Sequence, residues 1–342
     1  MVRAVTETCA ELTRLVGRPV EAAEFSFEVS AALRKAFAFD GWCLFGIDPD
    51  SGLRTVQFGG RGTEHTAEMA RNEALMSDVN KYGQLAGAER PAGWLSQDHP
   101  DARHSFRLHE ILLPQGFHSE VRLVLRDQGR LWGALVLFRE NPRCLLDDND
   151  SAALCAIADA LTNAIRAYPV RPIPRGGSER GPGIVALAPD DRLVTVSPQA
   201  QEWLDDLVPG GDDETYSSDV TRVLYDAAHA VRRDDPDRKS TCVRTVSGHW
   251  LHVAGDAISV GEADVAIVLQ PATVTQLLGA VAAYSKLTAR ESEVLGLLAH
   301  GLASKQIARE LAISLLTVNG HLRSMYRKCG VTGREELFGR YM

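Results

Sequence analysis

The sequence lacks any apolar run long enough to cross a membrane: stretches such as Leu131 to Phe138 hold about eight residues, where a spanning helix needs about 20. Charged side chains interrupt the first 25 residues throughout, so the apolar core of a secretory signal is missing too. The six cysteines, at positions 9, 43, 144, 155, 242 and 329, include no CxxC pair, and we expect them to be reduced. These absences predict a cytoplasmic protein without a membrane span.

Motifs that carry catalysis are also missing. The chain has no GxSxG elbow, no phosphate-binding P-loop and no HExxH zinc motif. Four histidines, His99, His104, His109 and His118, lie within 20 residues, but their spacings match no standard zinc site. We therefore expect no catalysis, no metal and no cofactor, while an enzyme that acts on a small molecule within the first 270 residues stays an open alternative.

Positive charge is scarce except at the end of the chain. The net charge of −8 would disfavour nucleic acid as a partner if it were evenly spread. Residues 280–342, however, carry nine Lys and Arg against five Glu, whereas the rest of the chain carries 28 basic and 40 acidic residues. This asymmetry predicts that only the C-terminal segment contacts a polyanion.

Proline and glycine alternate over residues 169–183, which predicts a linker between two independent cores. The region before it, 1–168, shows two hairpin patterns, one over 42–58 and one over 120–138. Helical spacings run over 25–37, over 69–79 and, as a final stripe, from Leu154 to Ile165. Together they predict an α+β domain with an antiparallel sheet.

This region resembles a GAF-type sensory domain. The resemblance is carried by the order of elements, by the Asp-Pro-Asp-Ser-Gly turn at 48–52 and by the string W-G-A-L-V-L-F-R at 132–139. It implies a sensory role for residues 1–168 and names no ligand.

Residues 184–272 show a second α+β pattern: strands at 184–188 and 193–196, a helix over 198–207, and three further strands at 241–246, 250–254 and 265–269. The order resembles a small PAS domain. An apolar stripe from Val274 to Tyr284 then predicts a connecting helix over 273–285.

The last 57 residues carry the clearest pattern. Thr288 and Glu291 form a capping box that starts a helix, and Gly301 is suited to the left-handed conformation that ends it. A helix at 305–311, a three-residue turn and a helix at 315–329 capped by Ser314 then predict a helix-turn-helix.

The strings L-T-A-R-E-S-E-V-L (287–295), G-L-A-S-K-Q-I-A (301–308) and T-V-N-G-H-L-R-S-M-Y-R-K-C-G-V (317–331) resemble the LuxR-type DNA-binding domain, an all-α four-helix fold, over 286–342. The resemblance implies three groups of site residues: base-reading Asn319, Gly320 and Arg323; backbone-contacting Lys305, Thr317, Arg327 and Lys328; and Leu337, Phe338 and Tyr341, which pair two subunits on DNA. The sequence departs from the family at 319, 320 and 329. Gly320 offers no side chain to a base, although its lack of bulk would let the helix lie closer to the groove.

These patterns predict a sequence-specific transcriptional regulator that binds double-stranded DNA as a homodimer and responds to a small molecule or partner at its sensory half. The alternative is a constitutive DNA-binding dimer whose N-terminal domains serve only oligomerisation or partner recruitment. The sequence predicts no ligand identity, no operator, and neither activation nor repression.

Overall fold

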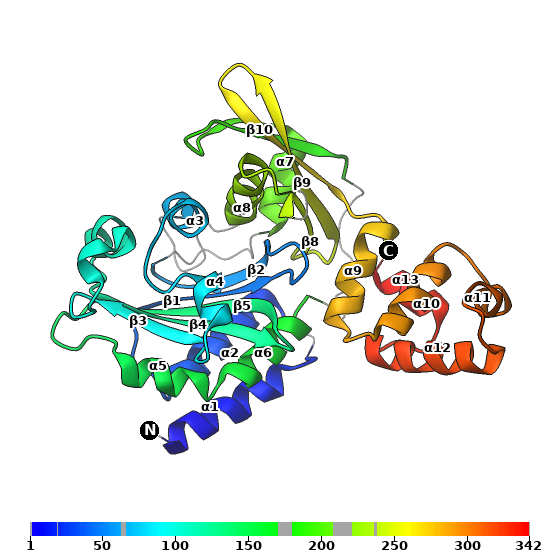
Figure 1. Cartoon of the computed structure of the whole chain (residues 1–342), viewed down its shortest axis with the longest axis horizontal. Helices are drawn as coiled ribbons and strands as arrows, with labels where there is room; N and C mark the ends of the chain where they lie inside the picture. Colours follow the sequence, from blue (N-terminus) through cyan, green and yellow to red (C-terminus); the bar gives the residue numbers. More distant parts are fainter. Residues whose placement is uncertain are drawn as a thin grey trace.

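The computed structural model describes residues 2–18, 20–62, 66–169, 180–207, 221–235 and 238–341. Two antiparallel sheets of five strands each lie next to one another, and a group of helices follows at the C-terminus (Figure 1). The predicted linker over 169–183 falls mostly on residues 170–179, which lie outside the described part of the chain, so it stays a prediction.

The first sheet has the order β2-β1-β5-β4-β3. Its strands are β1 Gly41–Ile47, β2 Arg54–Gly59, β3 Ala92–Ser96, β4 Ser119–Asp127 and β5 Arg130–Arg139. Gln128 (φ 52°) and Gly129 (φ 76°) close the β4–β5 hairpin in the left-handed conformation that a two-residue turn of this type needs, so the predicted hairpin is confirmed. The short strand β3 was not predicted.

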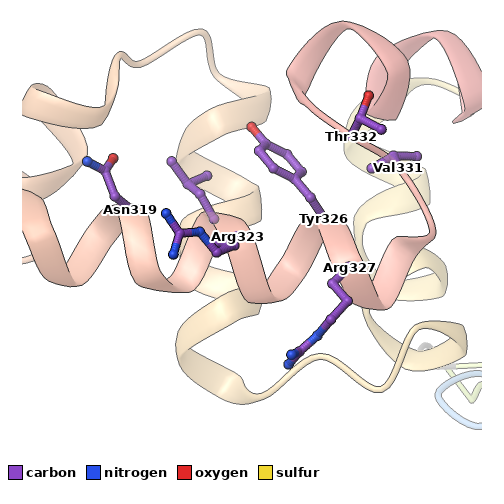
Figure 2. Close-up of a pocket in the computed structure, with 7 residues that line it drawn as sticks. Asn319, Arg323, Tyr326, Arg327, Val331 and Thr332 are labelled. Atoms are coloured by element: carbon purple, nitrogen blue, oxygen red, sulfur yellow. The ribbon is translucent and has the colours of Figure 1, made fainter.

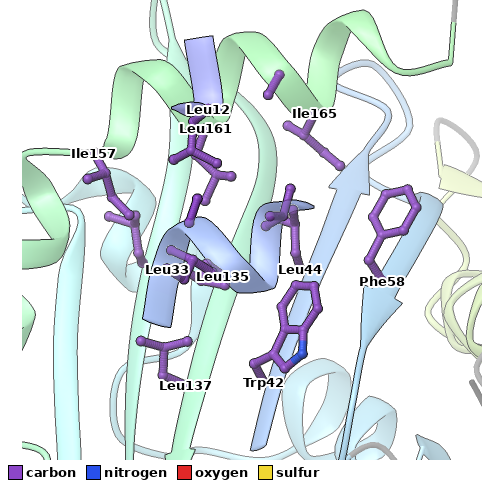
Figure 3. Packing of buried hydrophobic residues seen from close by; sticks show 14 of the residues in the cluster. Leu12, Leu33, Trp42, Leu44, Phe58, Leu135, Leu137, Ile157, Leu161 and Ile165 are labelled. Atoms are coloured by element: carbon purple, nitrogen blue, oxygen red, sulfur yellow. The ribbon is translucent and has the colours of Figure 1, made fainter. Parts of the chain in front are cut away.

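Both faces of this sheet are buried, each in its own hydrophobic core. Because successive side chains of a strand point to opposite faces, neighbouring residues of β1 pack in different cores. Leu44 packs in the core shared with helices α1 Val2–Leu15, α2 Ala22–Arg34, α5 Asp148–Cys155 and α6 Ala158–Ala167 (Figure 3). The next residue, Phe45, packs instead toward α4 Tyr82–Gly87 and a π-helix, Arg107–Leu112.

Two details correct the sequence-based elements of this region. The stripe from Leu154 to Ile165 is two helices, α5 and α6, separated by a turn at Ala156 and Ile157. The helix predicted over 69–79 is α3 Thr66–Leu75, which ends before Met76. Helix α1 was not predicted at all.

The second sheet repeats the strand order of the first when strands are counted within each sheet, β7-β6-β10-β9-β8. Its strands are β6 Gly183–Leu187, β7 Leu193–Val196, β8 Ser240–Arg244, β9 Trp250–Val260 and β10 Ala263–Pro271, with helices α7 Pro198–Leu207 and α8 Thr221–Arg232. The five predicted strands and α7 are confirmed, while β9 and β10 form a longer hairpin than predicted and α8 was missed.

The C-terminal part is helical throughout. It contains α9 Val274–Tyr284, α10 Ala289–Ala299, α11 Ser304–Glu310, α12 Leu315–Cys329 and α13 Arg334–Tyr341. The predicted helices are confirmed, and so is the capping box of α10, in which Thr288 Oγ1 accepts from the Glu291 amide and Glu291 accepts from the Thr288 amide. No helix in the described ranges has the length and apolarity of a membrane span.

Four aromatic side chains join the three parts of the chain, and we call them the aromatic junction: Trp132 of β5, Trp250 of β9, Tyr284 of α9 and Tyr341 of α13. The Tyr284 ring centroid lies 5.7 Å from that of Trp132 and 6.5 Å from that of Trp250. The Trp250 centroid lies 6.4 Å from that of Tyr341. An ion pair between Lys286 Nζ and Asp127 Oδ2 (3.1 Å) adds a second contact between the first sheet and the C-terminal part.

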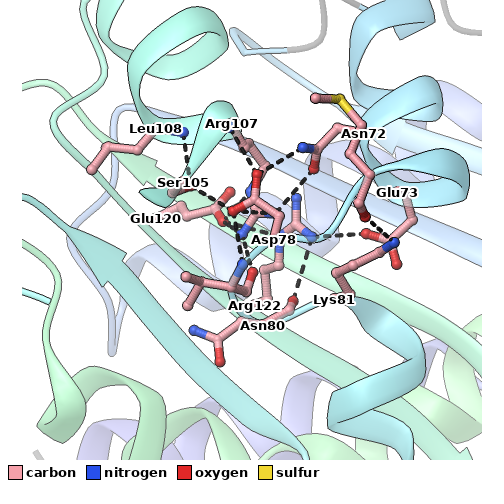
Figure 4. Close-up of polar contacts among 12 residues, drawn as sticks. Asn72, Glu73, Asp78, Asn80, Lys81, Ser105, Arg107, Leu108, Glu120 and Arg122 are labelled. Carbon is pink, nitrogen blue, oxygen red and sulfur yellow. Dashed lines mark hydrogen bonds and ion pairs between the residues drawn. The ribbon is translucent and has the colours of Figure 1, made fainter. Parts of the chain in front are cut away.

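A buried charge network, centred on Asp78, Arg107, Glu120 and Arg122, covers one side of β4 (Figure 4). Arg107 is fully buried, and its Nε donates to Glu120 Oε1 at 2.7 Å. Burial would raise the pKa of the Asp78 carboxyl, but the Arg107 guanidinium and hydrogen bonds from its neighbours lower it. The polar segment between the two predicted hairpins is therefore partly interior.

Candidate nucleic-acid interface

Helices α11 and α12 form the predicted helix-turn-helix. The turn between them is tight because Ala312 adopts φ 52°, and Ser314 Oγ accepts from the Thr317 amide at 3.0 Å to begin α12. The residues of α12 that face the domain core are Val318, Leu322, Met325 and Cys329, as their spacing predicts. The opposite side of α12 is therefore free to contact DNA.

The predicted base-reading residues lie on that free side. Asn319, Gly320 and Arg323 are exposed. Figure 2 shows Asn319 and Arg323 projecting from the same side of α12, while Arg327 points the other way. An open hollow of about 480 Å³ lies beside these side chains, lined by Asn319, Leu322, Arg323, Tyr326, Arg327, Val331 and Thr332.

The four predicted backbone contacts differ in their surroundings. Lys305, Thr317 and Arg327 are exposed. Lys328, by contrast, is 28% exposed and its Nζ lies 2.6 Å from Oε2 of the buried Glu291. Lys328 therefore stabilises the domain internally, and a contact to phosphate would have to use its remaining N–H donors.

The Glu291 carboxylate is held in its charged form. Burial would raise its pKa, but Lys328 and the hydrogen bonds from Thr288 lower it to about 2. The pairing was not apparent from the sequence because residues 291 and 328 are distant along the chain.

We expect a Glu291→Gln variant to be less stable at pH 7, by up to roughly 3 kcal/mol, because one pKa unit corresponds to about 1.4 kcal/mol. Since the folded pKa is depressed, the contribution is complete above about pH 5 and disappears as the pH falls toward 2, so the two proteins should converge there. Urea unfolding at a series of pH values measures this. Glu335→Gln, which alters an exposed carboxylate of the same domain, is the control; a difference for Glu291→Gln that does not change with pH would contradict the assignment.

The predicted pairing residues of α13 are largely covered within the chain. Leu337 and Tyr341 are 2% and 5% exposed, and Phe338 is half-buried. They pack against α9 and α10, with Trp250 beside Tyr341. At the start of α13, Glu336 Oε2 accepts hydrogen bonds from the amide and the hydroxyl of Thr332, both at 2.7 Å.

Sequence reasoning missed a second candidate site, a cleft of about 620 Å³ between the first sheet and α8. The Arg54 guanidinium lies 3.4 Å from the centroid of the Phe45 ring and its Nε 3.4 Å from Asp226 Oδ2 of α8. Arg233 donates to the Ala74 carbonyl across the opening at 3.1 Å. The arginines of 222–238 come from the second sheet's domain, so only the folded arrangement brings them to Phe45.

The side chains of His99 and His109, two of the four histidines between β3 and β4, have partners within the chain. His99 packs edge-on against Trp94, and His109 Nε2 lies 3.0 Å from the Ala102 carbonyl. Within the residues that the structure describes, no group of three or more His, Cys, Asp or Glu side chains is placed to hold a metal.

Similar proteins match mainly the C-terminal part. Residues 285–339 match the GerE family, bacterial regulatory proteins of the luxR family. A 52-residue stretch is 48% identical to the HTH-type transcriptional regulator MalT of Serratia proteamaculans (strain 568), and the stretch is 15% of this chain and 6% of that protein.

Two solved structures are similar at low identity. SdiA of Escherichia coli is 14% identical, with a TM-score of 0.35 over 98% of this chain and 95% of SdiA. The chromophore-binding domain of the bacteriophytochrome RpBphP3 from R. palustris is 13% identical, with a TM-score of 0.30 over 47% of this chain and 59% of that domain.

The family match and the exposed helix-turn-helix together establish that residues 285–339 form a DNA-binding domain of the luxR family of bacterial regulatory proteins.

Proposed function

We propose that the whole chain is a sequence-specific transcriptional regulator that binds double-stranded DNA as a homodimer and is controlled by a signal at its N-terminal half. The observation that carries the proposal is the luxR-family domain with Asn319 and Arg323 exposed on the free side of α12. In the major groove, arginine pairs bidentately with guanine and asparagine with adenine. Gly320 completes the base-reading set by letting α12 approach the base edges.

The backbone contacts are assigned to Lys305, Thr317, Arg327 and Lys328. Cations here neutralise phosphates and make affinity depend on salt, without selecting a sequence. These four residues lie in the C-terminal part, which is basic, whereas the rest of the chain is acidic, and this charge distribution supports the assignment.

Residues 1–168 and 184–272 are proposed as a GAF-like and a PAS-like sensory domain, separated by a linker at 169–183 and followed by a connecting helix at 273–285. The shared strand order of the two sheets supports related modules. The cleft between them supports a ligand site, because it combines an aromatic floor at Phe45 with several charged groups. A ligand there would contact both domains at once.

The signal would reach the DNA-binding domain through the aromatic junction. Leu337, Phe338 and Tyr341 are assigned to pairing two subunits on DNA, and Leu337 and Tyr341 are buried in the free chain. A change at the two sheets would alter how Trp132 and Trp250 hold Tyr284 and Tyr341. Pairing of two DNA-binding domains would thereby depend on the state of the sensory half.

The experiment that tests the function is selection of bound sequences from a random DNA pool by the full-length protein at fixed salt. Enrichment of a motif with two symmetric halves supports the dimeric regulator, and failure to enrich any sequence overturns it. A thermal-shift screen of the same protein with small metabolites separates a sensor from a constitutive dimer, because a ligand of the native state raises the melting temperature. Loss of that shift in Arg233→Ala would assign the ligand to the cleft.

We expect Arg323→Ala to weaken binding to the selected site by about 1 to 3 kcal/mol and to relax the preference at one base pair in each half-site. The matched control is Arg327→Ala, which should weaken binding to all sequences alike and lower the salt dependence by about one counterion. Kd measurements on the selected site and on single-base variants decide between them. Equal losses on every sequence would make Arg323 a phosphate contact.

A further inference from the structure

Two neighbouring positions on α12 are unexplained by the folded chain. Leu316 is 83% exposed, more than twice as much as the neighbouring Leu315, whereas Val318, Leu322 and Met325 of the same helix face the core. Single exposed leucines are common on protein surfaces and need no explanation by themselves. The exposed Leu316 becomes informative together with the second position, Gly320.

Nothing within the chain requires glycine at position 320. A Cβ added there would meet no atom within 4 Å, and the backbone of Gly320 is that of an ordinary helical residue, with no positive φ. Glycine is disfavoured inside a helix, so this position weakens α12 without any packing or backbone reason. Gly320 therefore leaves a stretch of bare backbone on the exposed side of α12.

Leu316 and Gly320 are four residues apart and so lie on one face of α12. Helical side chains lean toward the N-terminus, so Leu316 points away from Gly320 and leaves bare backbone beside its own methyl groups. Asn319 and Arg323, the polar base-reading residues, flank this bare surface in sequence. Leu316 and Gly320 thus give α12 an exposed apolar surface among the groups assigned to base edges.

We propose that Leu316 and Gly320 together recognise the 5-methyl group of thymine in the major groove. That methyl is the one apolar group that the base pairs present in the major groove, and apolar side chains contact it. Gly320 admits the methyl to the helix surface, and Leu316 contacts it from the N-terminal side. This inference rests on the proposed function, since it places a base contact within the DNA complex.

The test removes only the methyl group. In the selected DNA site, each thymine is replaced in turn by deoxyuridine, and Kd is measured with the full-length protein at fixed salt. One position in each half-site should lose about fourfold in affinity per replacement, which is the equivalent of one buried methyl group. In Leu316→Ala the thymine and uracil sites should bind equally, whereas the control Leu315→Ala, at the neighbouring 38% exposed leucine, should keep the preference.

Gly320→Ala gives an independent readout. The added methyl meets open space in the free protein, so α12 should become no less stable, while affinity for the thymine site falls at least tenfold because the close approach is blocked. Binding that is indifferent to every thymine-to-uracil replacement, or a preference unchanged in Leu316→Ala, would overturn the inference and leave the regulator function intact. A full-length protein that selects no DNA sequence would instead remove the proposed function and this inference with it.

Discussion

An Arg107→Met variant is expected to lose about 3 to 5 kcal/mol of its free energy of unfolding. The Arg107 guanidinium is fully buried and contacts Glu120 Oε1, Asn72 Oδ1 and the Val79 carbonyl. Methionine fills much of the volume but leaves the Glu120 carboxylate, itself 1% exposed, with Arg122 alone, and it removes the cation of the ion pair with Asp78. Uncompensated buried charge is far more costly than the pair itself is favourable.

Urea unfolding of the full-length chain measures this loss. Arg3→Ala is the matched control, because the pair between Arg3 and Glu7 has a similar distance, 2.9 Å, but the Arg3 side chain is 93% exposed. Exposed pairs contribute little, so Arg3→Ala should unfold at the same urea concentration as the parent protein. An Arg107→Met protein that unfolds with it would show that water reaches the buried charge network.

The DNA-binding domain was predictable because its signals are local. The capping box at Thr288, the glycine at position 301 and the cap at Ser314 each act within one helical turn, and the structure has all three. The buried stripe of α12 from Val318 to Cys329 follows from its spacing alone. Family resemblance then gave the exposed residues their expected roles.

What sequence reasoning missed depends on contacts between distant segments. Helix α8 packs on β9 and on α3 of the first domain, and the local sequence pattern does not predict these contacts. Nothing in the local sequence marks the charged side chains of residues 107 and 120 as buried, and only the packing of α3, the π-helix and β4 against one another buries them. The break between α5 and α6 has neither proline nor glycine to mark it.

A contact between distant segments also affects the pairing role expected for α13. The apolar residues of α13 are predicted from family resemblance to pair two subunits, which requires an accessible face. Tyr341 instead lies against Trp250, about ninety residues earlier in the chain. A surface of one domain is here covered by a side chain of another, and the pairing role requires that the cover be removed.

Trp250→Ala should therefore raise the apparent affinity for a two-half DNA site by roughly five- to 150-fold. The Trp250 ring is 5% exposed and packs on Tyr284 and Tyr341, and aromatic pairs contribute roughly 0.5 to 1.5 kcal/mol each beyond their buried area. Removing two such contacts shifts the balance between covered and uncovered α13 by about 1 to 3 kcal/mol, which is five- to 150-fold in population. Titration of the full-length protein onto one-half and two-half sites measures the effect, which should appear only on the latter.

Trp203→Ala supplies the comparison that separates release of α13 from general damage to the second sheet. Trp203 is also a buried tryptophan of that domain, but it packs in the core of the sheet and its Nε1 donates to the Gly181 carbonyl, away from α13. Both variants remove a large core side chain and should lower stability by a few kcal/mol. If pairing is controlled at the aromatic junction, only Trp250→Ala gains affinity for the two-half site. Equal gains in both variants would mean that unfolding of the second sheet, and not the contact with Tyr341, exposes the pairing face.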